Sequence, residues 1–240
     1  MGGPNVPQNR LERSYFMNLF DILGPVMVGP SSSHTAGAVR IGNMGLSLLG
    51  QKPVRAELLL HGSFASTGEG HGTHQALIAG LLGMAPDDIR VPNSFALAEE
   101  AGLSFTFEAC NLRDAHPNSA ILRLEGDKGG KVEVGAASLG GGRIQVFQLD
   151  GLQCVFTGAL PTLVVYNTDQ PGCVSQVSGT LANRGLNVAT LQLSRSSRGG
   201  DAVMVIECDH PISEEIAQEI RALPGILRVN RYSPEQEENA

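Results

Sequence analysis

Apolar and polar positions along the first 150 residues follow a helical spacing in some segments and alternate in others. Apolar residues between Thr35 and Leu49 recur on one helical face and Gly50 follows them, which predicts a helix closed by a glycine. Shorter apolar stretches at 75–82 and 94–101 predict two more helices. Segments in which apolar and polar residues alternate, each bounded by turn residues, predict strands at 54–60, 103–108, 120–125, 131–137 and 143–149.

From residue 162 onward the pattern becomes strand, helix, strand, strand, helix, strand. The expected elements are 162–167, 173–183, 187–194, 202–208, 213–222 and 226–232. This order is that of the βαββαβ, ferredoxin-like unit. The sequence therefore predicts an α+β protein in which a first mixed domain precedes a ferredoxin-like one.

Shifts in composition give the expected boundaries. A tail rich in Gly, Pro, Asn and Gln precedes the first domain, which opens with an apolar segment at 15–23, and a charged tail follows the second domain. We expect a tail at 1–13, a first domain at 14–150, a linker at 151–161, a second domain at 162–232 and a second tail at 233–240.

One loop before the first long helix concentrates polar chemistry. Its residues Ser31, Ser32, Ser33, His34 and Thr35 follow two Gly-Pro breaks and stand where a helix begins. One hydroxyl is enough to cap a helix, so three serines and an imidazole exceed what capping needs. Hydroxyls and the N–H groups of a helix start suit a small carboxylate or phosphate.

A second loop, 61–74, repeats this arrangement between a strand and a helix. It contains Gly68 and Gly70, which form a weak phosphate signal and serve equally well as turn residues. It also contains His61, His71 and His74, which lack the i, i+4 spacing of a zinc-binding helix. Proton transfer or carboxylate binding is the favoured role for His71, and the two helix starts are expected to face one pocket.

Two further segments are rich in turn residues. The segment 116–119 is expected to be an ordinary turn. Three consecutive glycines at 140–142 either form a wide hairpin bend or let the backbone approach a ligand or partner chain.

Composition narrows the partners. The net charge of −7, the absence of Trp and the lack of a basic stripe argue against nucleic acid. No stretch approaches the roughly 20 apolar residues of a membrane span, and the first residues lack the apolar core of a signal peptide. The four cysteines, at 110, 154, 173 and 208, form no closely spaced pair. We therefore expect a cytoplasmic protein with reduced thiols, a small-molecule ligand and no metal site in this chain.

The motifs of the first domain resemble the beta chain of iron–sulfur-dependent L-serine dehydratase. The resemblance rests on 20–25 running into 31–37, on 68–73, on 116–119 and on 138–142, and it extends over nearly the whole of 15–232. Ser-Ser-His-Thr is the specific element, and the glycine motifs support it.

The second domain is similar to an ACT domain, a fold whose amino-acid ligands usually sit at the turn after the first strand and at an interface with a second copy. On that pattern Asn167, Asp169 and Gly172 match the turn, and Asn187 matches the polar residue that opens the second strand and is expected to face that turn. ACT-like folds also serve purely for self-association, so both roles stay open.

The resemblance implies a two-chain lyase that converts L-serine to pyruvate and ammonia. In it, cysteines of a separate alpha chain hold a [4Fe–4S] cluster whose open iron acts as Lewis acid on the serine hydroxyl. Substrate binding would fall to Ser31, Ser32, Ser33 and Thr35, and proton transfer or positioning to His34 and His71. Related chains tend to carry an acidic residue after Gly-His-Gly-Thr, where this chain has His74, so His74 is left without a role.

Two other interpretations remain. The first domain also resembles the allosteric substrate-binding domain of some 3-phosphoglycerate dehydrogenases, which would make the chain a non-catalytic amino-acid sensor. A stand-alone metal hydrolase would instead need His34, His61, His71 and His74 to converge on one metal ion at about 2.0 to 2.1 Å.

Overall fold

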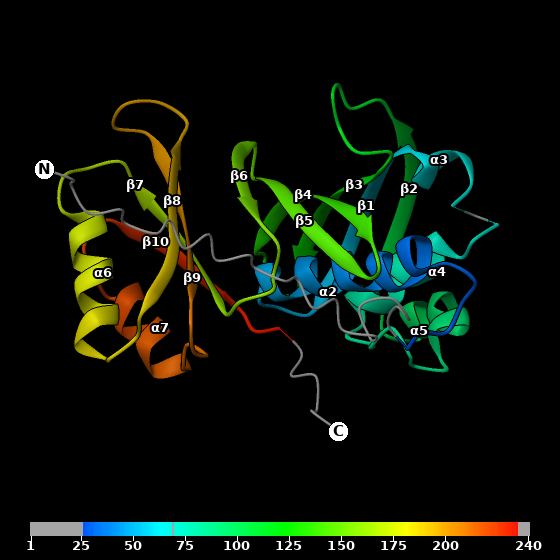
Figure 1. Cartoon of the computed structure of the whole chain (residues 1–240), viewed down its shortest axis with the longest axis horizontal. Coiled ribbons are helices and arrows are strands. Elements are labelled where there is room, and N and C mark those ends of the chain that lie inside the picture. Colours follow the sequence, from blue (N-terminus) through cyan, green and yellow to red (C-terminus); the bar gives the residue numbers. More distant parts are fainter. Residues whose placement is uncertain (1–25, 69, 235–240) are drawn as a thin grey trace, which may run out of the picture.

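The computed structural model describes residues 26–68 and 70–234, which form two α+β domains side by side (Figure 1). The expected apolar segment at 15–23 and tail at 1–13 lie outside the described residues, as does all of the second tail except Ser233 and Pro234. Among the described residues no helix is long and apolar enough to cross a membrane.

The first domain is built on a six-stranded sheet in the order β2-β1-β3-β4-β5-β6. Strand β1 runs parallel to β2 and antiparallel to β3, and the remaining neighbours are antiparallel. The strands are β1 (Pro53–Gly62), β2 (Ser104–Cys110), β3 (Asn118–Gly126), β4 (Lys131–Gly140), β5 (Arg143–Leu149) and β6 (Leu152–Phe156).

Helices lie against one face of this sheet (Figure 1). The long helix begins with a π-helical turn, η1 (Ser32–Ala36), continues as α2 (Gly37–Leu49) and ends at Gly50 with φ 64°, as the sequence predicts. The alternation along β1 and β3 buries Leu58 and Leu122 in the same core cluster as Met44 of α2. The other helices are α3 (Ser63–Ser66), α4 (Thr73–Leu81), the 3-10 turn η2 (Val91–Asn93) and α5 (Ser94–Glu100).

Helices α2 and α4 cross at two glycines. A Cβ at Gly42 would lie 2.3 Å from the carbonyl oxygen of Leu77, and one at Gly80 would lie 2.1 Å from that of Val39. Since no side chain fits at either position, the two helices approach backbone to backbone. This contact fixes the loop before α2 relative to the loop before α4, and both loops carry candidate site residues.

The second domain has the predicted βαββαβ order. A four-stranded sheet, β10-β7-β9-β8, carries two helices on one face (Figure 1). Its elements are β7 (Thr162–Thr168), α6 (Cys173–Asn183), β8 (Val188–Arg195), β9 (Asp201–Cys208), α7 (Glu214–Arg221) and β10 (Ile226–Tyr232). Alternate residues of β7 divide between two cores, because Leu163 and Val165 pack with the helices while Val164 joins the core cluster of the first domain.

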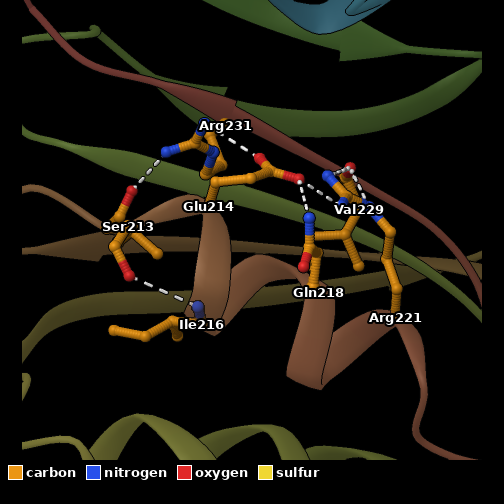
Figure 2. Close-up of polar contacts among 8 residues, drawn as sticks. Ser213, Glu214, Ile216, Gln218, Arg221, Val229 and Arg231 are labelled. Atoms are coloured by element: carbon orange, nitrogen blue, oxygen red, sulfur yellow. Dashed lines mark hydrogen bonds and ion pairs between the residues drawn. The ribbon is translucent and has the colours of Figure 1, made fainter.

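A polar network holds α7 to β10 (Figure 2). Ser213 caps the helix by accepting a hydrogen bond from the N–H of Ile216 at 3.3 Å. Glu214 binds Arg221 at 2.6 Å and Arg231 of β10 at 2.9 Å. Arg221 also donates to the carbonyl oxygen of Val229, so the network joins both ends of α7 to the neighbouring strand.

The expected linker at 151–161 is wrong in its first half. Residues 152–156 form β6, which pairs with β5 as the outer strand of the first sheet. Asp150 and Gly151 both have positive φ, 46° and 80°, and turn the chain tightly between β5 and β6. The first domain therefore extends to Phe156, and only a short connection separates it from β7.

Candidate functional site

The serine-rich loop enters the long helix through a capped π-helical turn. Ser31 is extended, and its hydroxyl accepts a hydrogen bond from the N–H of His34 at 3.3 Å. The carbonyl oxygen of Ser31 accepts from the N–H of Thr35 at 2.8 Å. Single π-helical turns within α-helices are frequent at functional sites, and this one directs the ring of His34 toward the second loop.

His34 lies between two pairs of hydroxyl groups and is only 9% exposed. Its Nδ1 is 3.2 Å from the Ser33 hydroxyl and 3.4 Å from that of Ser31. Its Nε2 is 3.1 Å from the Ser63 hydroxyl and 3.2 Å from that of Thr67. Both ring nitrogens therefore have polar partners, and the partners come from two loops that are distant in the sequence.

The second loop brings Ser63 to this place through the turn at 116–119. Gly62 has φ 58°, and a Cβ there would lie 2.6 Å from the carbonyl oxygen of Pro117. That same oxygen accepts from the N–H of Ser63 at 2.8 Å. The expected ordinary turn at 116–119 thus anchors the start of α3, and with it the hydroxyl that meets His34.

His71 closes the cluster. Its ring centroid is 5.0 Å from that of His34, and its Nδ1 donates to the carbonyl oxygen of Thr67 at 3.0 Å. Thr35 donates its hydroxyl to the carbonyl oxygen of His71 at 3.4 Å. The structure therefore brings His34 and His71 together, in line with the expectation that the two helix starts face one another.

The surroundings of His34 favour its neutral form. Burial lowers the pKa of His34 below its ordinary value of 6.5, and the neighbouring His71 lowers this pKa further, while a hydrogen bond with the backbone of Ser63 partly opposes both effects. An imidazole that stays neutral near pH 7 keeps one nitrogen lone pair available to accept a proton or a hydrogen bond.

The three glycines at 140–142 form the bend between β4 and β5. All three have positive φ, from 61° to 89°, and a Cβ added at Gly140 or Gly141 would meet nothing within 4 Å. The structure shows the bend of the first alternative, and the approach of a ligand or partner chain stays a prediction. Arg40 of α2 donates to the carbonyl oxygen of Gly142 at 3.1 Å and holds the bend against the helix.

The structure brings most of the predicted first-domain residues together and adds two that sequence reasoning missed. Ser31, Ser33, His34, Thr35 and His71 are joined by hydrogen bonds or ring contacts, and Ser32 lies in the same turn. The missed residues are Ser63 and Thr67. Their i, i+4 spacing right after a strand would have placed two hydroxyls on one side of a helical turn.

His61 and His74 contact residues outside the two loops. The Nδ1 of His61 accepts from the N–H of Leu112 at 3.1 Å, and the ring of His74 stacks on Phe107 with centroids 4.3 Å apart. Within residues 26–68 and 70–234, no three His, Cys, Asp or Glu side chains gather as metal ligands. The convergence of four histidines that a metal hydrolase would need does not occur.

The predicted ligand residues of the second domain fall in two places. Asp169 pairs with Arg195 at 2.8 Å and accepts from the N–H of Gly199 at 3.0 Å, while Gly172 begins α6 with φ 98°. Asn167 is buried, and its Oδ1 has no hydrogen-bond partner. Asn187 instead bonds Asp209 at 2.7 Å. Because β7 and β8 both run antiparallel to β9, Asn187 lies at the opposite end of the sheet from the Asp169–Gly172 turn of its own chain.

Comparisons with known proteins match this two-domain arrangement. A family model described as "Serine dehydratase beta chain" matches residues 17–103, and one described as "ACT domain" matches residues 162–225. The chain thus combines a serine dehydratase beta-chain domain with an ACT domain.

Relatives match over most of the chain. A protein of Bacillus subtilis named "Probable L-serine dehydratase, beta chain" is 38% identical over 91% of this chain and 99% of its own length. The "L-serine dehydratase, beta chain" of Peptoniphilus asaccharolyticus is also 38% identical, over 89% of this chain and 94% of its own. The chain therefore belongs to the L-serine dehydratase beta-chain family. The "D-3-phosphoglycerate dehydrogenase" of Methanocaldococcus jannaschii is 26% identical over 94% of this chain and 39% of its own.

Proposed function

We propose that this chain is the beta subunit of an L-serine dehydratase, a lyase that converts L-serine to pyruvate and ammonia. One observation carries the proposal: a buried imidazole, His34, is held between the hydroxyls of two loops and next to a second imidazole. Elimination of water from serine needs a site for the carboxylate, a base for the α-proton and a group that assists departure of the hydroxyl. The first two needs fit this cluster.

The serine loop suits the substrate carboxylate. Ser31, Ser32, Ser33 and Thr35 supply hydroxyls at the N-terminus of a helix that runs unbroken through η1 and α2. Charge-assisted hydrogen bonds and the helix dipole both favour an anion there. A carboxylate bound to this loop would lie beside His34.

His34 and His71 are the proposed proton-transfer or positioning residues. The lowered pKa of His34 keeps its ring neutral near pH 7, which is the state a base requires. The hydrogen bond from His71 to the carbonyl oxygen of Thr67 fixes the orientation of the second ring.

We further propose that a separate alpha chain binds this subunit and that its cysteines hold a [4Fe–4S] cluster. The four cysteines of this chain lie on β2, β6, α6 and β9 and do not converge on a cluster site. The residues present therefore do not fit the cluster, and the chemistry of hydroxyl departure is assigned to the partner. The proposal includes a cytoplasmic location, where these thiols stay reduced.

The ACT domain is proposed to mediate self-association and amino-acid binding. Strand β8 is an outer strand whose Leu191 and Leu193 are 37% and 43% exposed. If β8 pairs antiparallel with β8 of a second copy, Asn187 of one chain comes close to the Asp169–Gly172 turn of the other. Asn167, Asp169, Gly172 and Asn187 would then line one ligand site. Unchanged serine kinetics in an Asp169→Ala, Asn187→Ala variant would argue against this effector site.

A non-catalytic amino-acid sensor is the second candidate. The similarity to a phosphoglycerate dehydrogenase across 94% of this chain favours it. In that relative the matching region is 39% of a longer chain, which is named as a different enzyme. A sensor would bind L-serine without turning it over.

Pyruvate release from L-serine under strict anoxia separates the two candidates. We expect no release by this chain alone, release once an alpha chain with a reconstituted cluster is added, and loss of that release in His34→Ala. A thermal shift of the isolated chain by L-serine, without pyruvate release in the presence or absence of the alpha chain, would instead support the sensor.

A further inference from the structure

Thr67 has a single hydroxyl proton, and its hydrogen bonds determine where that proton goes. The Thr67 Oγ1 lies 2.9 Å from the carbonyl oxygen of Ser63. A carbonyl oxygen only accepts, so Thr67 must donate there. The two other contacts of Oγ1, with His34 Nε2 at 3.2 Å and with the Ser63 hydroxyl at 3.1 Å, are then left for its lone pairs to accept.

This constraint decides which nitrogen of His34 carries the proton. An Nε2 without a proton would place its lone pair against a lone pair of Thr67 Oγ1, which is repulsive. With the proton on Nε2, the ring donates toward Thr67 and Ser63, and the Ser63 hydroxyl donates to Thr67. The lone pair of neutral His34 then lies on Nδ1, next to the hydroxyls of Ser31 and Ser33.

The same residue decides the opposite arrangement in His71. The Nδ1 of His71 is 3.0 Å from the carbonyl oxygen of Thr67, so Nδ1 must carry a proton to donate. When His71 is neutral, its lone pair lies on Nε2. Thr67 thus contacts one histidine through its side chain and the other through its backbone.

We propose that Thr67 is a positioning residue that holds His34 and His71 in opposite tautomers, so that the proton-accepting atom is Nδ1 in His34 and Nε2 in His71. Within the proposed function, on which this part of the inference rests, Nδ1 of His34 is the atom that faces a substrate bound at the serine loop. The assignment of tautomers itself depends only on hydrogen bonds within this chain.

Nitrogen NMR of the ¹⁵N-labelled full chain, at a pH where both histidines are neutral, tests the assignment directly. We expect His34 to show a protonated Nε2 and an unprotonated Nδ1, and His71 to show the reverse. A protonated Nδ1 in neutral His34 would overturn the proposal.

Two substitutions separate the role of the hydroxyl from a merely structural role. Thr67→Val removes the hydroxyl and keeps the carbonyl, so His34 should become a mixture of tautomers while His71 stays unchanged as an internal control. Thr67→Ser restores the hydroxyl and should restore the single tautomer of His34. If His34 keeps its tautomer in folded Thr67→Val, as judged by circular dichroism and an otherwise unchanged amide spectrum, Thr67 does not set it.

Kinetics of the reconstituted two-chain enzyme test the link to function separately. Thr67→Val should lower kcat by about 100-fold, the lower end of the range that a positioned proton-transfer group supplies. Thr67→Ser should recover most of this loss. A changed tautomer with unchanged kcat would contradict the role of His34 in the proposed function and leave the tautomer assignment intact, so the two failures are distinguishable.

Discussion

The side-chain amide of Gln192 binds both backbone groups of Val155. Its Oε1 accepts from the Val155 N–H at 3.0 Å, and its Nε2 donates to the Val155 carbonyl oxygen. Val155 belongs to β6, the outer strand of the first sheet, and Gln192 belongs to β8 of the second domain. Ser194, two residues further along β8, donates to the carbonyl oxygen of Gln153. Side chains of one domain therefore occupy the strand edge of the other, which would otherwise expose pairing groups.

Gln192→Ala should expose this edge. We expect a loss of about 1 to 2 kcal/mol in the free energy of unfolding, since two backbone groups lose their partner, and faster hydrogen exchange at the Val155 amide. Urea unfolding and native-state exchange measure these effects. Gln176→Ala, an exposed glutamine of α6, is the matched control. Equal exchange at Val155 in wild type and Gln192→Ala would show that the contact does not protect the edge.

Arg228 should contribute strongly to the contact between domains. Its guanidinium lies 3.8 Å from the centroid of the Tyr166 ring, pairs with Asp150 at 2.6 Å and donates to the carbonyl oxygen of Lys131. Because a stacked, partly buried guanidinium is worth more than an exposed ion pair, Arg228→Ala should cost about 1 to 3 kcal/mol of unfolding free energy.

The control for Arg228 is Arg90→Ala. Arg90 is 63% exposed and pairs with Asp88 within its own loop at 2.6 Å, so its loss should lower the free energy of unfolding much less than the loss of Arg228 does. If urea unfolding showed similar losses of unfolding free energy for the two variants, the strong contribution of Arg228 to the contact between domains would be contradicted.

The glycine crossing of α2 and α4 predicts opposite effects of two glycine-to-alanine changes. Gly42→Ala should destabilise the chain by about 1 to 3 kcal/mol, because the new methyl group meets the backbone of α4 and forces the helices apart. Gly179→Ala in α6 meets nothing within 4 Å and should stabilise by about 0.5 to 1 kcal/mol through helix propensity. Thermal melts of both variants check this, and a neutral Gly42→Ala would contradict the close approach.

The pKa of His34 predicts how stability depends on pH. Burial first, and His71 second, lower this pKa below 6.5 in the folded chain, so the unfolded chain binds a proton more readily. The free energy of unfolding is therefore not reduced by this titration above pH 6.5. It decreases as the pH falls from there toward the folded pKa of His34, because protonation then favours the unfolded chain. Urea unfolding at several pH values should show a weaker decrease below pH 6.5 in His34→Asn than in wild type.

In an NMR titration, His71→Asn should raise the pKa of His34, because it removes the neighbouring positive charge. A folded pKa at or above 6.5 in the wild-type chain would contradict the prediction.

Local pattern was sufficient to predict most elements of this fold. The helix from Thr35 to Leu49 and the βαββαβ order are confirmed, because amphipathic spacing and glycine ends act within a few residues. Strand β6 was missed because a change in composition at Asp150 was given more weight than the Asp150-Gly151 pair, which is itself a strong hairpin signal. The pairing of β1 with both β2 and β3 depends on contacts across the chain and has no local signature.

Most residues of the candidate site could be selected from the sequence, but their arrangement could not. His34 and His71 could be selected because their loops contain more polar groups than capping needs. Ser63 and Thr67 were missed, because their place beside Nε2 of His34 depends on contacts distant in the sequence, among them the hydrogen bond from the Ser63 N–H to the carbonyl oxygen of Pro117. The expectation that Asn187 faces the Asp169–Gly172 turn is wrong within one chain, because β7 and β8 both run antiparallel to β9 and the length of the sheet separates the two.

Val164 of β7 points away from the helices of its own domain, as do Val203 and Val205 of β9, and all three join the core cluster of the first domain. Cutting the chain near Pro161 would therefore expose these three valines to solvent on one fragment and part of the hydrophobic core on the other. The two domains should melt in a single calorimetric transition, with no half-folded species between them. Replacing the ACT domain of this protein by one from another chain would therefore require redesign of these valine positions as well as of the connecting segment.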